Sequence, residues 1–199
     1  RPIFAARLAM RSRAVDAAFQ ASDVESRYPS IVREDAGYIT DKATWLRGVG
    51  RVGEARALLS APRQLRAPPL DPEEWLETLL TNARQADSGG DKLTAYNIAK
   101  QLDDALPAGT VIRDTELGVR DDYTSLAWLA GQLAMNDLGR PAEAAVHYHK
   151  YGEAARSAQT RTKGYYWAGR ASLAAGNRAS AQQHFASGAQ YYETFYGQL

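Results

Sequence analysis

A glycine followed five residues later by an alanine recurs four times in the chain, and this repeat limits the fold more than any other feature. In each copy the glycine is followed by Arg, Asn or Asp, and the copies are Gly50–Ala55, Gly90–Ala95, Gly139–Ala144 and Gly176–Ala181. Successive copies lie 40, 49 and 37 residues apart. These intervals are close to the periods of about 34 to 47 residues that are typical of stacked helical hairpins.

Each copy predicts the turn of an antiparallel helical hairpin. A glycine just beyond a helix adopts the left-handed conformation that ends the helix without a Cβ penalty. The alanine then falls in the first turns of the next helix, where its small side chain lets the partner helix approach. The helix before each turn carries one tryptophan: Trp45, Trp75, Trp128 and Trp167.

Composition favours the same fold. Alanine, the best helix former, occupies 36 of the 199 positions. We expect an all-α fold, a right-handed superhelix (solenoid) of antiparallel hairpins similar to tetratricopeptide arrays. Asp71-Pro72-Glu73-Glu74 is a strong helix start, with Asp as N-cap and Pro at the first helical position. Residues 3–10 and 12–26 are predicted to form one or two helices. The other predicted helices are 34–48, 52–60, 72–86, 91–105, 121–137, 141–156, 160–175 and 178–190, with a Pro-rich connection at 61–70 and an irregular stretch at 106–120.

Charge and cysteine content exclude several classes of function. Lys and Arg number 24 against 23 Asp and Glu, so the chain has no basic stripe for nucleic acid. With no cysteine, thiol catalysis and cysteine-ligated zinc are excluded. No apolar run approaches the about 20 residues of a membrane span.

The remaining candidates for chemistry have ordinary structural explanations. His147 and His149 are two residues apart, about 200° around a helix, so they cannot share a metal, and we expect these two and His184 to face solvent or lie between helices. Gly48, Gly50 and Gly53 match a dinucleotide-binding motif by letter but follow a helix, which indicates a hairpin turn. The acid pairs Glu73-Glu74 and Asp121-Asp122 are expected at helix starts, and Asp103-Asp104 at a helix end. We therefore predict no catalytic, cofactor-binding or metal-ligating residue.

Aromatic residues are concentrated in the last third of the chain. Two interpretations stay open: packing within the hairpins, or a surface for docking or for stacking on sugars. The residues are Tyr148, Tyr151, Tyr165, Tyr166, Trp167, Phe185, Tyr191, Tyr192, Phe195 and Tyr196.

Two motifs in this part carry a resemblance to a known family. The segment 165–171 reads Tyr-Tyr-Trp-Ala-Gly-Arg-Ala, and the chain closes at 194–199 with Thr-Phe-Tyr-Gly-Gln-Leu. In this order they resemble the superhelical region of soluble lytic murein transglycosylases, where a "YWxGRA" helix and a "TFYGQLA" segment precede the catalytic domain. The segments 127–131, 71–75 and 45–47 fit the same family more loosely, so that the resemblance covers most of 36–199.

The resemblance implies a periplasmic bacterial parent enzyme that acts on peptidoglycan. The parent would cleave the bond between N-acetylmuramic acid and N-acetylglucosamine, using one catalytic Glu and forming a 1,6-anhydro sugar. Residues 1–199 would be its scaffold, with a possible sub-boundary near 106–120 and without the lysozyme-like catalytic domain. Its partners would be glycan strands through the parent enzyme, and protein partners on the superhelix.

The family's catalytic Glu lies in an "ESxF…GLMQ" motif beyond the closing segment. Glu25-Ser26 is the one Glu-Ser pair here, but it has neither the Phe nor the later motif and lies on the other side of the scaffold. We expect the 199-residue chain alone to be inactive. The alternative is a stand-alone tetratricopeptide-like module for protein–protein interaction in the cell envelope.

Overall fold

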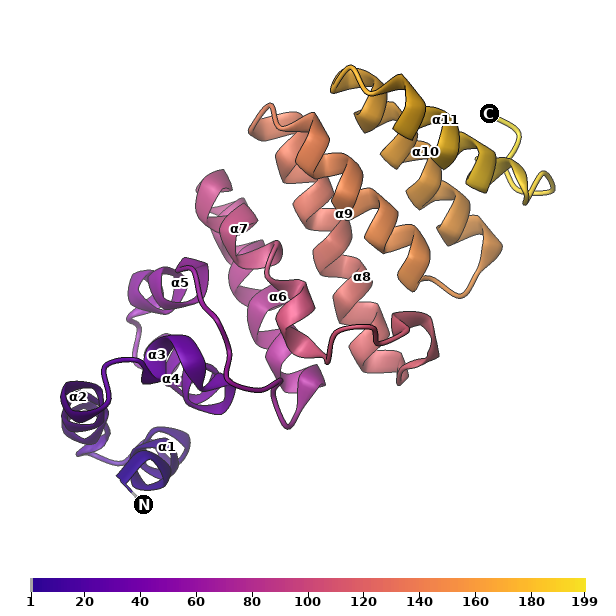
Figure 1. Cartoon of the computed structure of the whole chain (residues 1–199). Helices are drawn as coiled ribbons and strands as arrows, with labels where there is room; N and C mark the ends of the chain where they lie inside the picture. Colours follow the sequence, from indigo (N-terminus) through magenta and orange to yellow (C-terminus); the bar gives the residue numbers. More distant parts are fainter. Residues whose placement is uncertain (1) are drawn as a thin grey trace.

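The computed structural model describes residues 2–199, which form an all-helical protein without a strand in that range (Figure 1). Consecutive helices pack on one another along the chain. The α-helices are α1 (Pro2–Ser12), α2 (Ala17–Arg27), α3 (Ile31–Glu34), α4 (Ala36–Gly48), α5 (Val52–Ser60), α6 (Pro72–Ser88), α7 (Lys92–Ala99), α8 (Leu117–Gln132), α9 (Pro141–Ala154), α10 (Ala158–Ala174) and α11 (Arg178–Ala189). Two 3-10 turns (η1, Leu102–Ala105; η2, Ile112–Asp114) and a π-helical turn (η3, Leu133–Asp137) complete the fold.

The four repeated glycines end helices in the predicted way. Gly50, Gly90, Gly139 and Gly176 have φ angles of 83°, 84°, 63° and 77°. After three of them, the next backbone N–H donates to a carbonyl five residues back, which satisfies an end carbonyl of the helix. These bonds are Arg51 to Leu46 (2.8 Å), Asp91 to Ala86 (3.0 Å) and Asn177 to Ser172 (2.9 Å).

The turn at Gly139 is built differently. It follows the π-helical turn η3, and the Arg140 N–H donates to the carbonyl of Ala134, six residues back, at 2.7 Å. The wider turn adds backbone between α8 and α9, and the interval between the second and third glycines is the longest of the three.

The repeated alanines lie at helix contacts, as predicted. Ala55, Ala95, Ala144 and Ala181 are each at most 1% exposed. Of the tryptophans, Trp45 and Trp75 are buried, whereas Trp128 and Trp167 are partly exposed and pack against the edge of the core. The small residues therefore set how closely the helices approach, and the aromatic rings fill the space between them.

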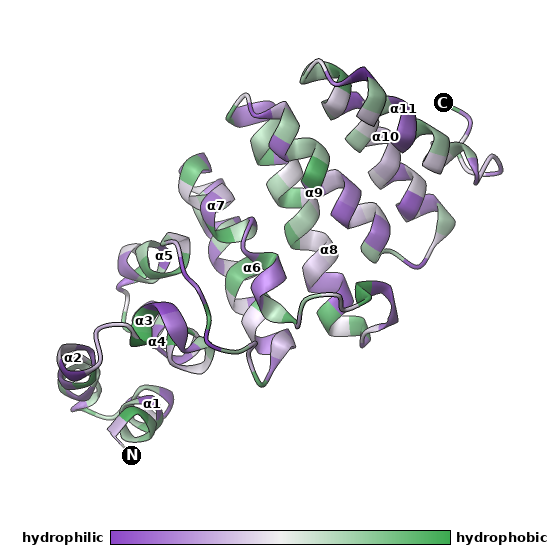
Figure 2. Cartoon of the chain, in the orientation of Figure 1, coloured by the Kyte–Doolittle hydropathy of each residue, from purple (hydrophilic) through white to green (hydrophobic). Residues whose placement is uncertain are grey.

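Helices α9 and α10 approach each other closely at two glycines. A Cβ placed on Gly164 would lie 2.5 Å from the Cα of Gly152 and 2.8 Å from the carbonyl oxygen of Tyr148. Real Cβ atoms do not approach so closely, so the backbones meet only because both positions lack side chains. Coloured by hydropathy, α10 is pale or hydrophilic over much of its length (Figure 2), and small or polar residues and one tyrosine make its buried contacts.

Helix α4 lies between two groups of buried side chains. Its Tyr38 and Leu46 pack with α1, α2 and α5, while its Ile39 packs in a larger core that extends through α6–α10. Both predicted edges of the irregular stretch are wrong: α7 ends at Ala99 and residues 102–105 form the 3-10 turn η1, whereas the prediction continued this helix to 105, and α8 begins at Leu117 rather than at 121. Its N-cap, Glu116, makes no side-chain capping bond, so the local sequence carries no start signal. The sub-boundary near 106–120 stays a prediction.

None of the helices in residues 2–199 combines the length and the apolar character that crossing a lipid bilayer requires.

Replacing a glycine with alanine should have opposite effects on stability at a left-handed turn and inside a helix. Gly90→Ala should lower the free energy of unfolding by about 1 kcal/mol, because a left-handed alanine costs about 1–2 kcal/mol. Gly53→Ala, inside α5 and likewise without a neighbour within 4 Å, should raise it by about 0.5 kcal/mol through the unfolded chain's entropy. Urea denaturation of both variants measures the difference, and equal effects would contradict the turn geometry.

Candidate functional site

One face of α10 combines two cations with two aromatic rings. Lys163, Tyr166, Trp167 and Arg170 follow the helical spacing of three, four and seven residues, so they share one side of the helix. The intervening Tyr165, with Ala168 and Gly169, is buried. Half of the Tyr-Tyr-Trp-Ala-Gly-Arg-Ala motif therefore builds the core, and the other half builds this surface, which we call the α10 face.

Side chains from α8 and α9 extend the α10 face at one end. The ring centroid of Trp128 lies 4.9 Å from that of Tyr151 and 6.5 Å from that of Trp167. The ammonium of Lys163 sits 3.6 Å from the Trp128 ring centroid and 5.5 Å from that of Tyr151. Such cation–π contacts hold the ammonium over the rings, and burial there lowers the pKa of Lys163.

The C-terminal segment extends the face at its other end. The Tyr166 ring lies 6.2 Å from Phe185 of α11 and 5.3 Å from Tyr196. The segment is fixed by Thr194, whose hydroxyl donates to the buried hydroxyl of Thr162 in α10 at 3.0 Å. Arg170 donates to the hydroxyl of Tyr166 at 2.9 Å. Aromatic rings from four elements thus surround one cationic helix face.

The charge on the α10 face is not neutralised within the described chain. Within residues 2–199, neither Lys163 nor Arg170 forms an ion pair with a carboxylate. Partly exposed aromatic rings bordered by free cations suit a ligand with apolar C–H surfaces and anionic groups. The aromatic cluster is therefore divided: Tyr148 and Tyr165 pack inside the hairpins, and Tyr166 and Tyr196 are partly exposed. The docking or sugar-stacking interpretation stays a prediction.

The histidines lie between helices. His147 is buried, with its ring edge-on to Tyr96 of α7 at 5.7 Å, and the rings of His149 and His184 lie 5.1 Å apart. Across residues 2–199 no group of three or more His, Asp or Glu side chains is arranged to hold a metal.

The acid pairs make structural contacts. Glu73 and Glu74 lie in the first turn of α6, as predicted. Asp103 accepts a hydrogen bond from Tyr123 at 2.7 Å and pairs with Lys150, and Asp104 pairs with Arg63 at 3.2 Å. The prediction for Asp121 and Asp122 is wrong, because α8 begins four residues earlier and both lie beyond its first three residues.

Glu25 also belongs to the packing of the N-terminal helices. Its carboxylate accepts a hydrogen bond from the Tyr38 hydroxyl at 2.7 Å and pairs with Lys42, both on α4. The carboxylate of the one Glu-Ser pair, Glu25-Ser26, therefore joins α2 to α4.

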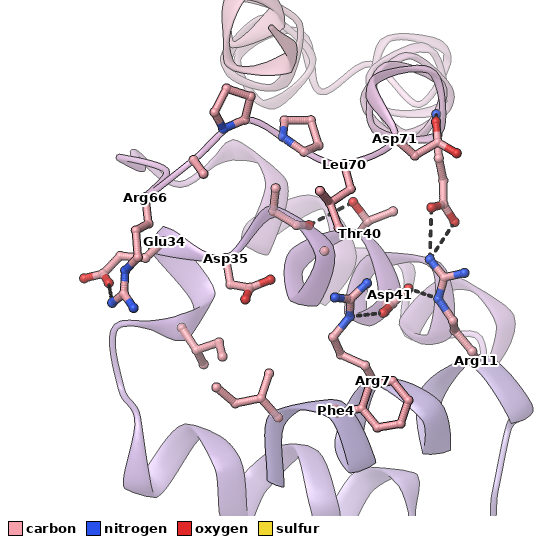
Figure 3. Close-up of a pocket in the computed structure, with 18 of the residues that line it drawn as sticks. Phe4, Arg7, Arg11, Glu34, Asp35, Thr40, Asp41, Arg66, Leu70 and Asp71 are labelled. Carbon is pink, nitrogen blue, oxygen red and sulfur yellow. Dashed lines mark hydrogen bonds and ion pairs between the residues drawn. The ribbon is translucent and has the colours of Figure 1, made fainter. Parts of the chain in front are cut away.

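A groove at the N-terminal end was missed by sequence reasoning. A cavity of about 730 Å³ lies between α1, the start of α4 and the Pro-rich segment 66–71 (Figure 3). The walls formed by α1 and by the segment 66–71 are more than fifty residues apart in the sequence, so no local sequence pattern predicts the cavity. One sequence signal could have indicated it. Phe4 and Leu8 are apolar residues one helical turn apart, and they lie outside the helix face that carries the buried Ala6 and Ala9.

A buried aspartate anchors one wall of this N-terminal groove. The side chain of Asp41 is 1% exposed and accepts hydrogen bonds from Nε of Arg7 and Nε of Arg11, each at 2.5 Å. Arg11 also reaches Glu74 at 3.0 Å, which ties α1 to both α4 and α6. Figure 3 shows Asp35 pointing into the cavity, with Leu70 of the Pro-rich segment 66–71 on the opposite side.

Comparison of the chain with protein-family models, curated proteins and solved structures found no match.

His147 predicts how stability depends on pH. Burial lowers the pKa of His147 from 6.5 to about 4, and its Nδ1 has no hydrogen-bond partner. The unfolded chain therefore binds a proton between these values that the folded chain does not, so stability falls as pH falls from about 6.5 to about 4.

Urea denaturation at pH 7.5 and pH 4 measures this loss. The wild type should lose about 3 kcal/mol more than His147→Gln over that interval. His184→Gln is the control, since His184 is partly exposed and its removal should alter the pH slope much less. Parallel curves for the wild type and His147→Gln would contradict the assignment.

Proposed function

We propose that the chain is the non-catalytic superhelical scaffold of a periplasmic peptidoglycan lytic transglycosylase, and that it positions glycan strands for the parent's catalytic domain. The parent cleaves the bond between N-acetylmuramic acid and N-acetylglucosamine and forms the 1,6-anhydro sugar. In this proposal the helical hairpins form a right-handed, tetratricopeptide-like superhelix, and the α10 face is where the glycan lies.

One observation carries the proposal: the two motifs of the resemblance are one structural unit. The Tyr-Tyr-Trp-Ala-Gly-Arg-Ala helix and the Thr-Phe-Tyr-Gly-Gln-Leu segment are joined by the buried hydrogen bond between Thr194 and Thr162 and by the tilted contact between the rings of Tyr166 and Tyr196. Residues that contact one another are constrained together, so their joint presence is stronger support for the family than either motif alone.

The chemistry of the α10 face suits a glycan strand. Peptidoglycan carries sugar rings with apolar C–H faces, and its muramic acid and stem peptides carry carboxylates. The rings of Trp167, Tyr166 and Tyr196 offer stacking surfaces, and Lys163 and Arg170 offer charge-assisted hydrogen bonds to carboxylates. In this role the chain's residues bind and orient the polymer, and the bond cleavage is left to the catalytic domain.

Cosedimentation with purified insoluble peptidoglycan tests the proposal. The chain should sediment with the polymer, and Lys163→Gln together with Arg170→Gln should reduce the bound fraction several-fold, because two cations are lost from the contact surface. The matched control, Arg33→Gln with Arg84→Gln, removes the same charge from two exposed arginines on α3 and α6 and should bind as the wild type does.

Two results would contradict the proposal. Retention no greater than that of an unrelated protein would exclude glycan positioning. Release of soluble 1,6-anhydro products by the 199 residues alone would exclude a non-catalytic scaffold. The gene sequence downstream of the codon for Leu199 offers a separate check, because the proposal requires a lysozyme-like segment with a Glu-Ser and a Gly-Leu-Met-Gln motif.

A further inference from the structure

The N-terminal groove has no part in the proposed function, yet it has the features of a binding site. Its volume of about 730 Å³ lies within the about 300–1,000 Å³ of typical ligand pockets. Phe4, Leu8 and Leu70 line it and are 70%, 56% and 102% exposed. One exposed apolar side chain is ordinary, but several around a single cavity indicate that a partner covers them.

The charges of the groove leave two aspartates without a cationic partner. Arg7 and Arg11 pair with Asp41, and Arg11 extends to Glu74. Arg66 pairs with Glu34, so three arginines balance three carboxylates on the groove wall. The remaining two lining carboxylates, Asp35 and Asp71, form no ion pair within residues 2–199, which gives the groove a formal charge of −2.

Asp35 and Asp71 share a second property: each caps a helix. Asp35 Oδ1 accepts the backbone N–H of Tyr38 at 2.8 Å, and Asp71 Oδ1 accepts that of Glu74 at 2.9 Å. The second carboxylate oxygen of each makes no hydrogen bond with residues 2–199 and is free to accept from a ligand. The helix N-termini, each worth about +0.5 charge, offset part of the negative charge but leave the groove net negative.

Arg7 supplies unused donors in the same space. Its Nε is bound to Asp41, while its terminal nitrogens make no hydrogen bond within the described residues. They lie against Gly37, where a Cβ would come within 2.5 Å of Nη1. The missing side chain leaves room for the guanidinium, whose N–H groups can donate to backbone carbonyls of a bound chain.

We propose that the groove binds an extended segment of a protein partner that presents apolar side chains next to lysine or arginine. The apolar side chains would cover Phe4, Leu8 and Leu70, and the cations would meet Asp35 and Asp71. Charge selects this occupant: a net negative groove repels nucleic acid, anionic lipid and the carboxylates of a glycan. The inference holds whether or not the α10 face binds glycan.

A synthetic peptide array tests the proposal. Nine-residue peptides with fixed Leu, Phe and Pro positions carry Lys, Gln or Glu at the remaining positions. The chain should bind the Lys series in preference to the Gln and Glu series. The tightest Lys peptide is then labelled with fluorescein, and its affinity is measured by anisotropy at low and high salt, with weaker binding expected at high salt.

Matched variants identify the groove as the binding surface. Asp35→Asn with Asp71→Asn removes both charges but keeps the caps, since Asn caps helices as well as Asp, and should weaken binding roughly 3- to 10-fold, as expected for two exposed ion pairs. Leu70→Ser should also weaken binding, without a folding cost at a fully exposed position. Asp91→Asn with Asp137→Asn removes the same charge elsewhere and should leave affinity unchanged.

Several outcomes would overturn the inference. These are no binding by any peptide, preference for the Glu series, or equal affinity in the groove and control variants. Analytical ultracentrifugation of the chain alone tests whether a second copy of the chain fills the groove instead. Self-association that the Asp35→Asn, Asp71→Asn variant abolishes would show that it does.

Discussion

The packing of this chain depends on how closely its helical backbones can approach. At the contact of α9 with α10, Gly164 lies against Gly152 with no room for a Cβ on either side. At the hairpin turns the same limit is met by Ala55, Ala95, Ala144 and Ala181, all essentially unexposed. Small contact residues bury little apolar area, so the aromatic rings around them must supply the rest. The packing of Tyr148, Tyr165 and Trp128 meets this requirement. Because Tyr165 faces inward, the neighbouring Tyr166 and Trp167 are left on the outer face of α10.

Much of the fold follows from local sequence signals. The left-handed glycines, the cap at Asp71 and the alanine spacing each express a short-range steric rule, and the structure obeys them. The sequence predicts the wrong start for α8 because Glu116 supplies no capping bond, whereas Asp121 is a residue type that often caps a helix. The π-helical turn before Gly139 has no local signature either. Both failures occur where tertiary packing, rather than propensity, decides the backbone.

The two candidate surfaces differ in how far sequence reasoning could reach them. The α10 face lies on consecutive helical turns, so its residues were recognisable as an aromatic cluster, although which rings face outward depends on the packing of Tyr165 and Gly169. The N-terminal groove brings α1 against the segment 66–71, and only the folded chain joins them. Its charge could not be counted from sequence, because the pairing of Asp41 with Arg7 and Arg11 decides which carboxylates are left over.

The two surfaces have opposite electrostatic character, and this difference argues that they bind different things. Lys163 and Arg170 give the α10 face unpaired positive charge, while Asp35 and Asp71 give the groove unpaired negative charge. A nearly neutral chain with a net charge of +1 therefore has two locally charged surfaces at its two ends. An anionic polymer on α10 would be excluded from the groove, and a basic segment in the groove would be repelled by the α10 face. Under the two proposals, the chain would hold a polymer and a protein partner at once without competition between them.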